Sequence, residues 1–327
     1  MANILILGAG AMGSAFTLPC VDNGNDVTLA GSPLEDDIID KLNTKNKFHE
    51  VLNCALPQKL KAIKVGNLSE ELKKKPDLIV IGVNSRGVEW AGKEISKNYD
   101  SKTPIILLTK GLTIIDNKFE TLAEKLRIIL KNNGIKKVNI SAVAGPCLAK
   151  DLSNKIRSSV VLANPDLKII KSIGKIVSTN YYSIEYSNDL FGVEVCAAIK
   201  NFYSMIIGSS EGLNTAASLM HKSIIEMVNF TKALGGKEET VYGLAGLGDL
   251  YVSSAGGRNS KMGKYLGEGY LYSKAKSKFM SQETVEGAQL AFEIGPKILK
   301  DLNKKDFPLM YGLVDALCND KKLEIKW

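Results

Sequence analysis

The chain has 327 residues, of which 45% are hydrophobic and 24% are charged, and its formal net charge is +8. This composition is that of a folded globular protein rather than a disordered or fibrous one, and the length suits about two domains. Apolar runs such as residues 78–83 are much shorter than the roughly 20 residues of a membrane-spanning helix. The N-terminus lacks the basic segment and cleavage site of a signal peptide. We therefore expect a cytoplasmic protein without a membrane span.

The cysteine and histidine content argues against metal and hydrolase chemistry. The five cysteines are scattered and contain no Cys-x-x-Cys pair, so neither a disulfide framework nor a zinc site is indicated. Only two histidines occur, His49 and His221, and no G-x-S-x-G nucleophile motif is present. His49 lies in a polar stretch, and we expect it at the surface. We therefore predict no bound metal.

The positive charge has two interpretations. Nucleic-acid binding is one, and a set of solvated lysine-rich helix faces is the other. Lysine runs such as residues 73–75 favour the second, so no nucleic-acid partner is expected. A modest positive field would also attract a phosphorylated small molecule.

Strands and helices are predicted to alternate in the first part of the chain. The predicted strands are residues 2–7, 26–30, 78–83, 105–109, 138–143 and 159–162, and helices are predicted at 14–23, 88–97 and 118–130. This alternation favours a parallel sheet with helical crossovers. Helical periodicity dominates later, at 190–208, 216–234 and 284–302. We expect an α/β Rossmann-like N-terminal domain with a parallel-rich sheet over residues 1–187, followed by an all-α C-terminal domain over 188–327.

A glycine-rich turn with the sequence GAGAMG lies between the first predicted strand and helix. The G-x-G-x-x-G pattern in this context is typical of dinucleotide binding. Gly8 permits the tight turn, Gly10 lets the backbone approach a pyrophosphate, and Gly13 lets the helix pack on the strand. Ala11 and Met12 begin the helix, whose N-terminal N–H groups attract phosphate. NAD or NADP is the predicted cofactor.

The preference between these two coenzymes stays open in the sequence. An NAD-specific fold usually has an acidic residue at the end of its second strand. Here that strand ends in Ala30-Gly31-Ser32, with neither a carboxylate nor an arginine. Ser32 is the expected cofactor contact. Glu35, Asp36 and Asp37 follow closely, and they could either bind a ribose or repel a phosphate.

Two further segments follow predicted strands. Lys110 is suited to an anionic ligand, although a lysine at a strand end is also compatible with a plain surface position. The segment 144–150 would bring backbone N–H groups close to a ligand. Within it, Cys147 is either a nucleophile or a residue that lines the ligand, and the second is favoured because nothing nearby would form a thiolate.

The helical half contains a candidate proton donor. Lys200 follows Val193, Ala197 and Ile199, which recur at helical spacing, and a lysine among core positions must reach a partner or a cleft. Desolvation and neighbouring positive charge would tune it for acid/base work. Asp249 could orient this lysine, and an arginine such as Arg258 can bind a phosphate with two hydrogen bonds.

Taken together, the motifs resemble those of one enzyme family. They are GAGAMG at 8–13, TKG at 109–111, AGPCLAKDL at 144–152, NDLFGVEVCAAIKN at 188–201, GLGDL at 246–250, RN at 258–259 and VEG at 285–287. In this order and spacing they are similar to the NAD(P)-dependent glycerol-3-phosphate dehydrogenases of the bacterial type. That family interconverts sn-glycerol 3-phosphate and dihydroxyacetone phosphate by hydride transfer.

The resemblance implies a role for each matching residue. Lys200 would be the general acid/base, Lys110 would contact substrate and cofactor and polarise the carbonyl, and Asp249 would hold the lysine or a substrate hydroxyl. A homodimer is a further family expectation. The other implied contacts are Arg258 and Asn259 with the substrate phosphate, Gly145 and Cys147 with the substrate, and Arg258, Ala149 and Glu286 with the cofactor.

Two alternatives remain. The family usually has serine or threonine where Cys147 stands, and a basic residue where Ala216 stands, and segment 214–223 is atypical. These departures fit a dehydrogenase of the same fold that acts on a different hydroxy or keto substrate. The other alternative is a non-catalytic dinucleotide sensor, against which Lys110, Lys200 and Asp249 argue.

Overall fold

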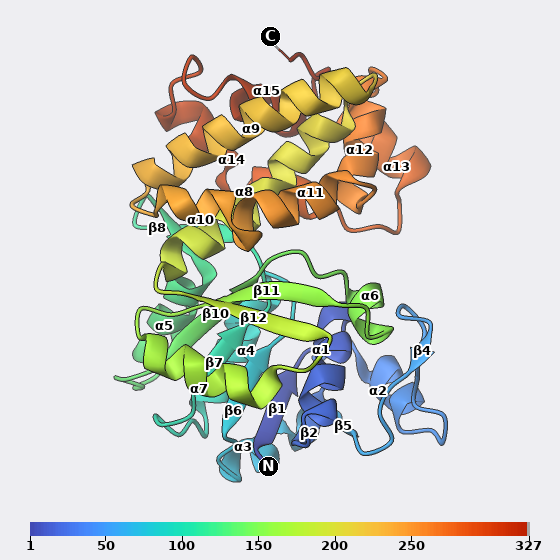
Figure 1. Ribbon diagram of the computed structural model, residues 1–327, viewed down its shortest axis with the longest axis vertical. Coiled ribbons are helices and arrows are strands. Elements are labelled where there is room, and N and C mark those ends of the chain that lie inside the picture. Colours follow the sequence, from blue (N-terminus) through green and yellow to red (C-terminus); the bar gives the residue numbers. More distant parts are fainter. Residues whose placement is uncertain (326–327) are drawn as a thin grey trace. The chain divides into compact units, whose positions relative to one another are not determined.

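Strand β1 (Asn3–Leu7) lies inside a sheet, between β2 (Asp26–Ala30) and β6 (Leu78–Ile81), and pairs in parallel with both. The structure is a computed structural model, and it describes residues 1–325. Ile4 to Leu7 are all buried, because helices cover both faces of the sheet (Figure 1). A strand buried on both faces has a continuous apolar sequence, which is why this segment could be predicted.

The sheet has eight strands in the order β12-β11-β10-β7-β6-β1-β2-β5. All neighbours are parallel except β10 and β11, so the predicted parallel-rich Rossmann-like sheet is confirmed. Strands β5 and β12 at its two edges were not predicted, since β5 is short and β12 is largely polar. The remaining strands are β5 (Lys61–Ile63), β7 (Ile105–Leu107), β10 (Ile140–Ala144), β11 (Ser158–Ala163) and β12 (Tyr182–Ser187).

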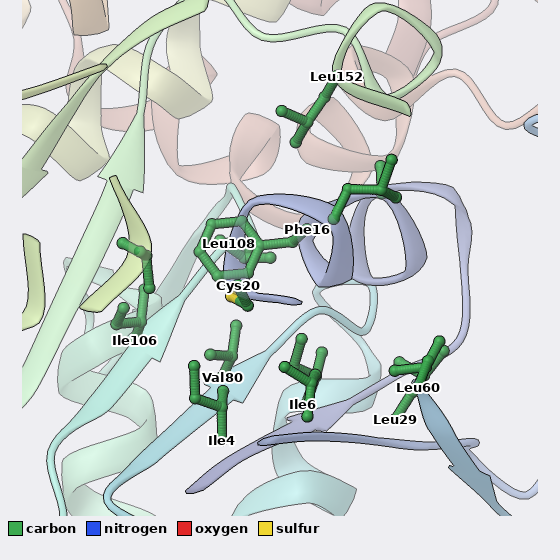
Figure 2. Close-up of a cluster of buried hydrophobic side chains, with 14 of the residues drawn as sticks. Ile4, Ile6, Phe16, Cys20, Leu29, Leu60, Val80, Ile106, Leu108 and Leu152 are labelled. Atoms are coloured by element: carbon green, nitrogen blue, oxygen red, sulfur yellow. The ribbon is translucent and has the colours of Figure 1, made fainter. Parts of the chain in front are cut away.

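One core cluster lies between the sheet and helix α1 (Ala11–Asp22). Phe16 and Cys20 of α1 point toward alternate residues of the central strands (Figure 2). The ring of Phe16 meets Tyr182 of β12 edge to face, with 5.8 Å between the centroids. This packing fixes the start of α1 above the sheet. Figure 2 labels the strand residues Ile4, Ile6, Val80 and Ile106 of this cluster, and Leu108, which follows β7.

The chain divides into two compact units. Unit 1 consists of residues 1–110 and 122–190, and unit 2 of residues 111–121 and 191–327. The remaining elements of unit 1 are α2 (Asp36–Leu42), β3 (Phe48–His49), β4 (Cys54–Ala55), η1 (Val65–Asn67), α3 (Leu68–Lys73), α4 (Gly87–Ser96), α5 (Leu122–Asn132), α6 (Ala149–Ser153) and α7 (Leu167–Val177).

A hairpin of β8 (Leu112–Ile115) and β9 (Lys118–Thr121) belongs to unit 2, although the sequence placed it in the first domain. The predicted helix over 118–130 is therefore wrong at its start, and α5 begins at Leu122. Phe119 packs edge to face on Phe230, with centroids 5.6 Å apart. This contact lies far away in the sequence, so helical spacing alone could not reveal that residues 118–121 form a strand.

Unit 2 is helical apart from its hairpin, as predicted. Helix α8 (Leu190–Gly208) is long and apolar enough to cross a membrane, but 94% of its apolar window is buried within the protein, as in a core helix. A Cβ on Gly263 would lie 1.9 Å from the carbonyl oxygen of Met205, so α12 packs directly on the α8 backbone. The other elements are α9 (Leu213–Ala233), α10 (Glu238–Tyr242), η2 (Leu244–Gly248), α11 (Asp249–Ser254), α12 (Arg258–Gly267), α13 (Tyr272–Phe279), α14 (Glu286–Asp301) and α15 (Pro308–Cys318).

Candidate active site

The glycine-rich turn has the geometry of an anion cradle. Gly8 has a φ of +106°, and a Cβ on Gly13 would lie 2.1 Å from the carbonyl oxygen of Gly8. The N-cap residue Gly10 is extended, and no side chain caps the helix that Ala11 and Met12 begin. First-turn N–H groups lack partners within a helix and are a ready site for phosphate. The residues present therefore fit the pyrophosphate of a dinucleotide.

Both backbone polar groups of Ala9, inside this turn, are hydrogen-bonded to side chains. Its N–H donates to Oε2 of Glu35 at 2.9 Å, and its carbonyl oxygen accepts from the hydroxyl of Ser14 at 3.0 Å. Oε2 of Glu35 also accepts from the backbone N–H of Ser32 at 2.7 Å. The carboxylate of Glu35 thus links Ser32 to the turn. The Ser-x-x-Glu spacing could have revealed this contact, because such a glutamate folds back to the serine N–H.

His49 is buried beneath the same turn, so the prediction that it lies at the surface is wrong. The residue is only 2% exposed, and its Nε2 lies 3.1 Å from the carbonyl oxygen of Ala9. Nδ1 accepts from the N–H of Leu52 at 3.3 Å, which places the ring proton on Nε2. The polar sequence around His49 misled the prediction because strands β3 and β4 fold back toward the turn.

The remaining candidates of unit 1 follow neighbouring parallel strands. Lys110 comes after β7 and Gly145 after β10, and these strands pair with each other. Their carboxyl ends share the edge of the sheet at which Gly8 follows β1, where ligands bind in this type of fold. Gly145 has a φ of +122°, and Cys147 packs against the core cluster. Ala149 is the first residue of α6.

Unit 2 contains a buried ion pair. Lys200 on α8 is 5% exposed and donates from Nζ to Oδ1 of Asp249 at 2.9 Å. The hydroxyl of Ser253 lies 2.5 Å from the same Nζ. A buried ammonium is tolerated only when it is paired and hydrogen-bonded. A π-helical turn, η2, leads directly into Asp249, and such turns are frequent at functional sites.

Ser253 was not predicted from the sequence. It lies four residues after Asp249 on α11, and this spacing places both side chains on the same face of the helix. In the sequence, Ser253 could have been found from an Asp-x-x-x-Ser pair in a chain that also has a lysine at a core position.

Asn259 connects three helices of unit 2. Its Nδ2 donates to Oδ1 of Asn201 at 2.8 Å, and its Oδ1 accepts from the N–H of Gly287 at 2.9 Å. These bonds link α12 with α8 and α14. The amide keeps one further N–H that could meet a ligand.

Arg258 and Glu286 form an exposed ion pair, with 3.0 Å between Nη2 and Oε1. The two side chains are 51% and 47% exposed. Pairs of this kind contribute only about 0 to 1 kcal/mol, so the guanidinium can exchange its partner for a phosphate. The structure thus brings together two of the predicted cofactor contacts.

Both halves of the chain are similar to known proteins. The family models for the N-terminus and the C-terminus of NAD-dependent glycerol-3-phosphate dehydrogenase match residues 3–170 and 189–325. An NADP(+)-dependent glycerol-3-phosphate dehydrogenase of Archaeoglobus fulgidus is 30% identical over 93% of this chain and 92% of its own. A glycerol-3-phosphate dehydrogenase [NAD(P)+] of Clostridium botulinum is 28% identical over 99% of this chain and all of its own.

Solved structures show the same fold. The crystal structure of glycerol-3-phosphate dehydrogenase from Coxiella burnetii is 26% identical, with a TM-score of 0.82 over 98% of this chain and 96% of its own. The Plasmodium falciparum enzyme, 20% identical over 98% and 92% of the two chains, has a TM-score of 0.84, which supports the fold alone. The two matched segments span the glycine turn, Lys200, Asp249 and the Arg258–Glu286 pair. The chain therefore belongs to the NAD-dependent glycerol-3-phosphate dehydrogenase family.

Proposed function

We propose that this protein interconverts sn-glycerol 3-phosphate and dihydroxyacetone phosphate with NAD or NADP as coenzyme. The observation that carries the proposal is the buried Lys200–Asp249 pair in a chain that also has an intact dinucleotide turn. A sensor would need the turn but no buried ammonium. The names of the relatives support the substrate.

The coenzyme supplies a hydride in the direction of ketone reduction and accepts one in the reverse direction. Lys200 then has to deliver a proton from Nζ to the carbonyl oxygen, and Asp249 and Ser253 hold that ammonium in place. A preorganised positive charge also stabilises the developing alkoxide. Lys110 polarises the carbonyl in this proposal. Gly145 and Cys147 line the substrate, and Ser32 and Ala149 contact the coenzyme.

The phosphate of the substrate is assigned to Arg258, with Asn259 beside it. The half-exposed guanidinium is a two-pronged donor, and its exposed partner Glu286 competes weakly. Asn259 is fixed by its bonds to Asn201 and Gly287, so it holds the start of α12 in position. In this proposal unit 1 binds the coenzyme, and unit 2 supplies the acid/base group.

The cellular setting forms part of the same proposal. We place the protein in the cytoplasm as a homodimer that does not bind nucleic acid. Surface lysines that pair within one helical turn, such as Lys93 with Glu89 and Lys97 with Glu94, support a solvated charged surface. The homodimer is an expectation from the family, and light scattering would measure it.

The direct test is coenzyme oxidation with dihydroxyacetone phosphate, run with NADH and NADPH in parallel. Turnover with this substrate, and little with unphosphorylated dihydroxyacetone, is expected. If ketopantoate or another ketone were reduced and dihydroxyacetone phosphate were not, the alternative substrate class would replace this proposal. Coenzyme binding without turnover on any ketone would favour the sensor.

A further inference from the structure

Glu35 carries a carboxylate to the place where a Rossmann fold usually has its acidic residue. The end of β2 has no acidic side chain, because Ala30, Gly31 and Ser32 stand there. Glu35, just before α2, folds back instead, and its Oε2 accepts from the N–H groups of Ala9 and Ser32. Its carboxylate thus joins the glycine turn to the end of β2. These are the two features that flank the adenosine ribose in such folds.

The other oxygen of this carboxylate lies beside Gly10 of the turn. Oε1 lies 3.6 Å from the position that a Cβ on Gly10 would occupy, and Gly10 is where the backbone approaches the coenzyme. Within residues 1–325, both hydrogen bonds that the Glu35 carboxylate accepts end on Oε2. Oε1 is therefore an acceptor suited to a ribose hydroxyl.

The surroundings of Glu35 are acidic. Residues 26–40 contain no lysine or arginine, and Asp36, Asp37 and Asp40 follow Glu35. Lys64 is the lysine on which the charges of Asp36 and Asp37 act, and it pairs with Asp40, so the three carboxylates outnumber it. A 2′-phosphate at this site would therefore meet an excess of negative charge.

We propose that Glu35 determines coenzyme specificity, by accepting hydrogen bonds from the ribose hydroxyls of NAD(H) and repelling the 2′-phosphate of NADP(H). The inference deepens the proposed dehydrogenase function, on which it rests. Family membership leaves the choice open, since the Archaeoglobus relative is named NADP(+)-dependent. Glu35 is thus a positioning and specificity residue, and it takes no part in the hydride or proton transfer.

The test is the affinity of the full-length protein for NADH and for NADPH, measured by coenzyme fluorescence without substrate. We expect NADH to bind about tenfold more tightly or better, which corresponds to about 1.4 kcal/mol. Glu35→Gln removes the negative charge and is expected to bring the two affinities close together, chiefly because NADPH binds more tightly. Glu70→Gln is the matched control, since it removes the same charge from an exposed side chain on α3 that pairs with Lys73, and it should keep the preference.

Tighter binding of NADPH by the wild-type protein would overturn the proposal, and this readout needs no variant to fold. An equal increase in the affinity for both coenzymes in Glu35→Gln would also overturn it, because Glu35 would then only block the turn and would not distinguish the two coenzymes. Failure of this proposal can be distinguished from failure of the proposed reaction. If NADH binds preferentially but dihydroxyacetone phosphate is not reduced, the proposed reaction fails and the role of Glu35 stands.

Discussion

Lys200 and Asp249 are 49 residues apart in the chain, yet the lysine Nζ lies 2.9 Å from the aspartate Oδ1. Both side chains are almost fully buried, at 7% and 5% exposed. Separating the two would leave an unpaired charge in a poorly hydrated place, at a cost of about 3 to 5 kcal/mol. The pair therefore holds one orientation of the ammonium, which a proton donor needs.

Lys200→Ala is expected to lower kcat by about 10² to 10⁴-fold, the range for loss of a general acid. Steady-state kinetics with dihydroxyacetone phosphate measures this. Lys232→Ala is the control, because that lysine belongs to an exposed pair with Glu238. A kcat near that of the wild type in Lys200→Ala would remove the residue from the mechanism.

Ser253→Ala is expected to lower kcat by about 10- to 100-fold with little change in KM, because loss of one hydrogen bond to a charged group is worth about 1.5 to 3 kcal/mol. The adjacent Ser254→Ala is its matched control, since that hydroxyl donates only to the backbone carbonyl of Tyr251. A pH profile of kcat should move in Ser253→Ala alone. Equal effects in the two variants would mean that Ser253 is merely structural.

Arg258→Ala is expected mainly to raise the KM for a phosphorylated substrate, because the guanidinium is assigned to the phosphate. The exposed pair with Glu286 contributes little, so thermal stability should hardly change. Dihydroxyacetone, which lacks the phosphate, gives the comparison. If the KM for the phosphorylated ketone stayed the same while binding of the unphosphorylated one fell, the phosphate role would be wrong.

Gly13→Ala is expected to abolish coenzyme binding, since its Cβ would lie 2.1 Å from a backbone oxygen and the turn would have to move. Gly66→Ala is the control, because its Cβ would have no neighbour within 4 Å. Coenzyme fluorescence titration measures both. Normal NADH binding by a folded Gly13→Ala variant would contradict the role of this turn.

The raised pKa of Glu226 predicts that the stability of the fold depends on pH. Burial raises the pKa of this carboxyl from near 4.5 to about 7, against the lowering effect of the N–H groups of Leu309 and Met310, the Tyr203 hydroxyl and the Lys222 charge. The folded protein therefore binds a proton that the unfolded chain releases. The contribution of this proton to the free energy of unfolding is complete below pH 4.5. It falls as the pH rises through 7, by about 3 kcal/mol at most.

Urea unfolding at pH 5 and pH 8 checks this pH dependence. Glu226→Gln, which cannot ionise, should lose less free energy of unfolding between these pH values than the wild type does. The exposed Glu239→Gln should behave as the wild type. Parallel pH dependence in the wild type and Glu226→Gln would refute the assignment.

The sequence by itself determined the elements whose signals are local. The glycine turn of residues 8–13 is typical of a strand followed by a helix. In α8, apolar residues recur at helical spacing on both sides of Lys200. These patterns predict the Rossmann-like sheet, the helical second half and the lysine. They do so because backbone conformation and burial of one face are recorded in residues that are near neighbours in the chain.

Only the tertiary structure decided which distant groups meet. The hairpin 111–121 belongs to unit 2 because Phe119 packs on Phe230, and His49 is buried because the chain folds back onto Ala9. The contacts of Ser253 with Lys200, and of Glu35 with the glycine turn, also join separate elements. A polar side chain is buried wherever a distant partner compensates for its lost hydration, and no local pattern records that partner.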